Sequence, residues 1–82
     1  MRACWEVIEA RVLEFPHLFV AFADGTRGSF DFTPYLDLPA FEKLNDPAFF
    51  ALARVEGGTV AWPQHIDIAP ERLHDECVRI EP

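Results

Sequence analysis

The chain has 82 residues, an apolar content of 50% and a formal net charge of −7. This length predicts one domain over residues 1–82, and the apolar content excludes a disordered chain. The 7 lysine and arginine residues form no run, so we expect no binding to nucleic acid and no docking on an anionic membrane. An acidic surface favours a basic protein partner instead.

No apolar run reaches the ~20 residues of a membrane span, and no hydrophobic signal region follows Met1. We therefore expect a cytoplasmic protein. Cys4 and Cys77 are too few for a disulfide framework, and we expect no bridge between them in a reducing compartment.

The first half of the chain has the pattern of an antiparallel meander. Residues 5–13 mix apolar and charged side chains, as in a strand that partly faces solvent. Residues 18–22 are continuously apolar, which predicts a central strand buried on both faces. Asp24-Gly25 is a strong hairpin signal. The return strand then alternates, with Gly28, Phe30 and Phe32 on one side and Arg27, Ser29 and Asp31 on the other.

Two short helices are predicted next, because Thr33-Pro34 and Asp46-Pro47 each place a capping side chain before a proline. Pro39 should stop the turn that Thr33 opens, and residues 41–44 form another short turn. The second helix covers residues 48–52.

The end of the chain predicts a hairpin and a last helix. Gly57-Gly58 joins strands at 53–56 and 59–62, and Pro63 ends the second strand. A helix begins at Ala69-Pro70, with Asp67 as the expected cap. Its buried face carries Leu73 and Cys77, one turn apart. The predicted class is therefore α+β: an antiparallel meander of about three strands plus a short hairpin, with short helices packed on it.

Three segments of the chain together resemble the bacterial domain-of-unknown-function family DUF2442. They are residues 22–36, with Phe22-Ala23-Asp24-Gly25 and Asp31-Phe32-Thr33-Pro34; Phe41, Leu44, Asp46-Pro47 and Phe49-Phe50; and residues 57–73, with Gly57-Gly58-Thr59-Val60-Ala61-Trp62-Pro63 and Asp67-Ile68-Ala69-Pro70. Their order and spacing cover nearly the whole chain.

The resemblance implies a small α+β domain with a bent antiparallel sheet, and it implies no activity, cofactor or substrate. Members of this family occur alone or fused to a helix-turn-helix domain. They are often encoded beside another small protein, an arrangement similar to toxin–antitoxin pairs. The family often has Asn-Gly after Trp-Pro, whereas this chain has Gln64-His65. That difference disfavours the usual tight turn at this point.

Candidate reactive groups are sparse in the sequence. His74 and Cys77 lie three apart on a predicted helix, and His65 precedes it, but paired zinc-ligand spacing is lacking. A Cys77–histidine catalytic pair is disfavoured, since a helix C-terminus and acidic neighbours raise a thiol pKa. We assign Asp24, Asp31 and Asp67 to turns and caps rather than to acid–base work. We therefore predict no catalytic residue, no metal and no cofactor.

The candidate binding residues are Trp5, Trp62, His65 and Asp67. Each tryptophan belongs either to the core or to an interface. The main functional hypothesis is a non-catalytic protein–protein interaction module, the antitoxin-like or regulatory half of a two-gene pair whose partner is the product of an adjacent gene. The alternative is a small-ligand-binding or enzymatic domain with a pocket near Trp62–Asp67. A homo-oligomer is compatible with both hypotheses.

Overall fold

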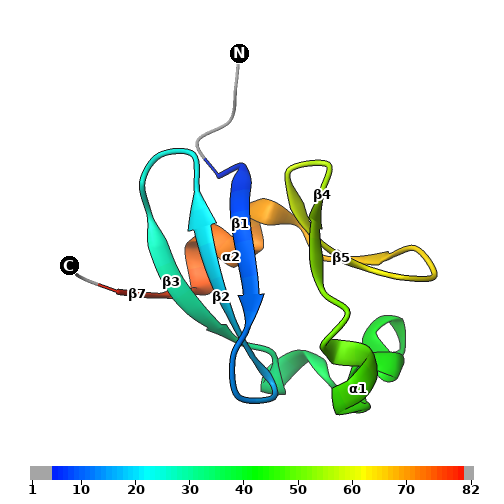
Figure 1. Cartoon of the computed structure of the whole chain (residues 1–82). Helices are drawn as coiled ribbons and strands as arrows, with labels where there is room; N and C mark the ends of the chain where they lie inside the picture. The colour runs from blue at the N-terminus through cyan, green and yellow to red at the C-terminus, as the bar shows by residue number, and fades with distance from the viewer. Residues whose placement is uncertain (1–4, 81–82) are drawn as a thin grey trace.

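The computed structural model describes residues 5–80 and contains two antiparallel sheets with short helices (Figure 1). The first sheet has the order β1-β2-β3-β7, with β1 (Val7–Val12), β2 (His17–Phe22), β3 (Arg27–Asp31) and β7 (Val78–Arg79). The second sheet has the order β4-β5-β6, with β4 (Arg54–Glu56), β5 (Thr59–Trp62) and β6 (Ile66–Asp67). The predicted α+β class is confirmed, and each sheet gains one edge strand that the sequence did not predict.

The meander forms as its turn and its alternation predict. β2 pairs with β1 on one side and with β3 on the other, so it is a central strand. Gly25 adopts a positive φ of 93° in the turn between β2 and β3. The Asp24 carboxylate accepts a hydrogen bond of 2.8 Å from the Thr26 N–H and closes that turn.

β2 is buried on both faces for two different reasons. Leu18, Val20 and Phe22 point into the hydrophobic core. Phe19 points the other way and is still only 5% exposed. The guanidinium carbons of Arg11 and Arg27 lie 4.7 and 5.5 Å from the centre of its ring. Arginine side chains, rather than a helix, therefore cover this face of the strand.

The helices are two 3-10 helices, η1 (Thr33–Tyr35) and η2 (Pro39–Asn45), followed by α1 (Pro47–Phe50) and α2 (Pro70–Glu76). The Asp46 carboxylate caps α1 through the Ala48 N–H at 3.0 Å, as predicted. One detail of η1 was predicted wrongly, because the Thr33 hydroxyl caps no N–H of this helix. The Asp31 carboxylate, two residues upstream, instead accepts the Thr33 N–H. The turn that Thr33 opens ends before Pro39, and Pro39 begins η2, because a first helical residue needs no N–H donor.

Aromatic rings fill the core where the two sheets and α1 meet. Phe32, Phe50 and Trp62 are each no more than 1% exposed, and their rings are mutual neighbours. Leu73 of α2 belongs to the same core, and α2 lies behind the first sheet in the view of Figure 1. Among the described residues, no helix combines the length and the hydropathy of a membrane-crossing segment.

Candidate functional site

A hollow of about 420 Å³ lies on the second sheet. Cross-strand pairing places Arg54, Ala61 and Asp67 on one face of this sheet, and Val60 and Trp62 on the other. The second group faces the core, so the first group forms the polar outer side. We call this feature the hairpin hollow; it is lined by Arg54, Glu56, Gly57, Thr59, Ala61, Trp62, Gln64, His65, Ile66 and Asp67.

The hairpin hollow is deep because the small residue Ala61 lies between two larger residues, Arg54 and Asp67. Ala61 pairs with Arg54 on one side and with Asp67 on the other. A methyl side chain in the middle of this row leaves space between the neighbouring guanidinium and carboxylate. The hollow therefore has an apolar floor with charged groups at its sides.

The charges around the hairpin hollow are not balanced. Nη2 and Nε of Arg54 lie 2.7 and 2.9 Å from the same carboxylate oxygen of Glu56, so these two side chains neutralise each other. Within residues 5–80, the Asp67 carboxylate makes no hydrogen bond or ion pair. Asp67 is therefore the acidic residue of the hollow to which no basic side chain of the described residues is bound.

Asp67 does not cap the last helix, which corrects the expectation from the sequence. No side chain accepts a hydrogen bond from the N-terminus of α2. Pairing with Ala61 turns the Asp67 side chain toward the hairpin hollow instead. The ladder between β5 and β6 thus decides the direction of this carboxylate.

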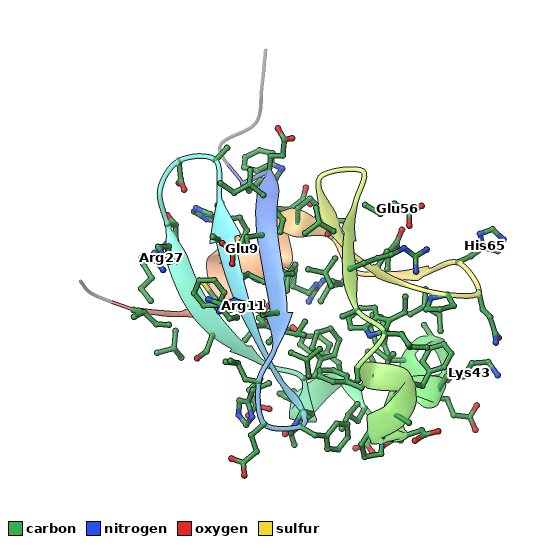
Figure 2. All side chains as sticks on the ribbon, viewed as in Figure 1. Glu9, Arg11, Arg27, Lys43, Glu56 and His65 are labelled. Carbon is green, nitrogen blue, oxygen red and sulfur yellow. The ribbon has the colours of Figure 1, made fainter. Side chains whose placement is uncertain are left out.

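Gln64 and His65 form the tip between β5 and β6, and both have a left-handed backbone, with φ of 68° and 64°. A tight turn therefore exists where the sequence disfavoured one. A residue other than glycine costs roughly 1 kcal/mol in this left-handed conformation. The pairing of Trp62 with Ile66 on either side of the tip holds Gln64 and His65 in it. Figure 2 shows His65 at the far end of this hairpin, and Gln64 also lines a more open hollow beside η2 and α1.

The two tryptophans take different places. Trp62 is 1% exposed, and its indole N–H donates a hydrogen bond of 2.9 Å to the Phe50 carbonyl oxygen, so it is a core residue beneath the hairpin hollow. Trp5 is 41% exposed and lies in the turn before β1. Of the predicted binding residues, the structure brings Trp62, His65 and Asp67 together and leaves Trp5 elsewhere.

Cys77 and the histidines do not converge on a common point. The Cys77 Sγ–H donates to the backbone carbonyl of His74 at 3.6 Å, and burial raises the pKa of the thiol. The predicted direction of that shift is confirmed, with burial as its main cause. His65 is at the hairpin tip, and no group of three metal-ligating side chains occurs in the part of the chain described. Cys4 lies outside the described residues.

An Asp24–His74 contact joins the hairpin turn of the first sheet to α2, and no local sequence pattern predicts it. Nε2 of His74 lies 2.9 Å from the Asp24 carboxylate, and the imidazole packs edge-on against Phe22. A second polar contact connects η1 to α2, in which the Tyr35 hydroxyl donates to the Glu76 carboxylate. Both contacts join residues distant in sequence, so no local spacing reveals them.

The Asp24 contacts predict a loss of stability in acid. The Thr26 backbone N–H and the His74 side chain hold the pKa of Asp24 at about 2, below its ordinary value of 3.8. A lowered native pKa stabilises the fold above the unfolded pKa, and this contribution disappears as the pH falls through the native value. We expect the urea midpoint to fall between about pH 4 and pH 2, and Asp24→Asn to reduce that slope.

The variant His74→Gln is the informative comparison. It keeps the Thr26 hydrogen bond, which is the larger cause of the lowered pKa, so most of the acid slope should remain. An unchanged slope in Asp24→Asn would contradict this account of acid stability.

Comparison with known proteins gives one result. The family model described as "Protein of unknown function (DUF2442)" matches residues 7–79, which run from the first residue of β1 to the last residue of β7. No curated protein and no solved structure shows significant similarity to the chain. The matched range contains both sheets and the hairpin hollow, and the chain belongs to the DUF2442 family.

Proposed function

We propose that this domain is a non-catalytic protein–protein interaction module, and that its hairpin hollow receives a basic side chain of the partner. The observation that carries the proposal is the Asp67 carboxylate, which lines the hollow and has no partner within residues 5–80. A lysine or arginine side chain entering over Ala61 gives that carboxylate an opposite charge.

The rest of the molecule supports a basic partner. The net charge of −7 attracts positively charged proteins and speeds their encounter. The hollow is open and its sides carry charged groups, which suits a protruding side chain better than an enclosed, largely apolar ligand. The raised pKa of Cys77 disfavours a thiolate nucleophile and is consistent with a role without catalysis. In this proposal the domain is the regulatory half of a two-gene pair, bound to the product of an adjacent gene.

The test is an NMR titration of the labelled protein with N-acetyl-arginine amide. We expect amide shifts concentrated at Ala61 and Asp67, with a Kd of about 1 mM or weaker, because one exposed ion pair adds only ~0.2–1 kcal/mol. Asp67→Asn should weaken binding by roughly two- to fivefold. Asp75→Asn removes the same charge from the exposed surface of α2 and should leave binding unchanged.

Two further ligands separate the outcomes. N-acetyl-glutamate amide should cause no shifts at these residues, and equal shifts with both blocked amino acids would refute a site for cations. Putrescine tests the alternative hypothesis of a small-ligand pocket. Putrescine binding at least ~10-fold tighter than the arginine compound would favour a small amine as the natural ligand over a protein side chain.

A further inference from the structure

The first sheet has one face that no helix covers. Alternation along the strands points Glu9, Phe19, Arg27 and Val78 away from the core. Figure 2 shows Glu9, Arg11 and Arg27 together on this side, and α2 lies on the opposite side of the sheet. We call it the outer face; it consists of Glu9, Arg11, Leu13, His17, Phe19, Ala21, Arg27, Ser29, Asp31, Val78 and Ile80.

One row of residues across the outer face carries opposite charges on the two sides of β2, so it is complementary in charge to a second copy that faces it in the reverse order. Register places Glu9 of β1 beside Ala21 of β2, and Ala21 beside Arg27 of β3. Beyond Arg27 lies Ile80, whose N–H donates to the Arg27 carbonyl at 2.8 Å. Beside Glu9 is Ile8, which sits in the irregular part of the β1–β2 pairing and is 59% exposed. The row across the strands thus reads acidic, small, basic, apolar, and Ile8 precedes Glu9 along the edge strand β1.

We infer that a second copy of this chain packs on the outer face, related by a twofold axis that runs parallel to β2. Rotation about this axis exchanges the β1 side of the sheet for the β3 side. Glu9 of each copy then lies opposite Arg27 of the other. Glu9 already pairs with Arg11 of its own chain at 3.2 Å, and Arg27 of the second copy would join this exposed ion pair. A twofold interface requires such a self-complementary surface.

The middle of the outer face suits close contact between sheets. Ala21 and Phe19 of β2 lie near the axis, and the Phe19 ring already lies beneath two guanidinium groups. Facing sheets pack ~10 Å apart, a gap that glutamate and arginine side chains can bridge. Val78 and Ile80 are 71% and 50% exposed, and the second copy would cover part of this apolar surface.

Reversal of single charges tests the arrangement. Glu9→Arg places two basic groups opposite each other, and Arg27→Glu places two acidic groups opposite each other. Each variant should therefore weaken self-association at least about tenfold. An equimolar mixture of the two variants restores opposite charges at both positions, so the mixture should associate as heterodimers with near wild-type strength.

The measurement is sedimentation equilibrium from about 10 μM to about 1 mM, the range of weak and transient association. Asp37→Arg, an exposed residue outside the outer face, changes the net charge as Glu9→Arg does and serves as the control. Circular dichroism verifies that each variant is folded. A wild-type protein that remains monomeric at the highest concentration, or a mixture that associates no better than the single variants, would overturn the inference. Neither result bears on arginine binding at Asp67.

Discussion

Replacement of Phe32 by alanine is expected to cost about 3–5 kcal/mol of folding free energy, because it opens a cavity at the centre of the aromatic core. Phe32 is 0% exposed, and its ring centre lies 5.1 Å from that of Phe30, 5.3 Å from that of Trp62 and 5.7 Å from that of Phe50. A domain of this size has a total stability of roughly 4–12 kcal/mol, so a large share would be lost.

Urea denaturation followed by circular dichroism measures this effect. Leu52→Ala is the matched control, because Leu52 is 51% exposed and its truncation removes far less buried surface. The control should lose less than ~1 kcal/mol. Equal midpoints for Phe32→Ala and Leu52→Ala would show that Phe32 does not lie at the centre of the core.

Gly28→Ala is expected to displace β7 and to destabilise the domain by roughly 1–3 kcal/mol. A Cβ atom at this position would lie 2.6 Å from the Val78 carbonyl oxygen and 3.0 Å from the Cys77 Sγ. The Val78 backbone cannot move away without disturbing its pairing with Ser29. Hydrogen exchange at the Ile80 amide, which donates to Arg27, should accelerate strongly.

Gly57→Ala is the control that separates the steric clash expected in Gly28→Ala from the backbone strain of replacing a glycine at positive φ. Nothing lies within 4 Å of a Cβ atom built at Gly57, although its φ is +62°. This control should lose only about 1 kcal/mol through backbone strain and should leave the Ile80 amide protected. Slow exchange at Ile80 in Gly28→Ala would contradict the close approach of β7 to β3.

Local signals explain which parts of the fold the sequence predicts. Asp24-Gly25 and the alternation around Phe30 specify the meander without reference to distant residues. β6 and β7 have two residues each, too few for any periodic pattern. β7 depends on the missing side chain of Gly28, some fifty residues upstream, and its pairing could not be predicted from the sequence around Val78.

The hairpin hollow was only partly predictable. Pro63 and the polar residues after it indicated a loop near His65 and Asp67, and both residues line the hollow. Its floor at Ala61 and the direction of the Asp67 side chain follow from register between strands. A single sequence does not specify that register, because a shift of one residue would turn Asp67 to the other face.

The hydrogen bond from the Trp62 indole to the Phe50 carbonyl has a consequence for how the chain folds. Trp62 comes from the second sheet, Phe50 from α1, and Phe32 directly follows the last strand of the meander. These three residues belong to one cluster, so the two sheets share a single hydrophobic core. The domain should therefore gain and lose its structure in a single cooperative transition. A fragment ending before residue 57 would lack the core residues Val60, Trp62, Ile68, Leu73 and Cys77.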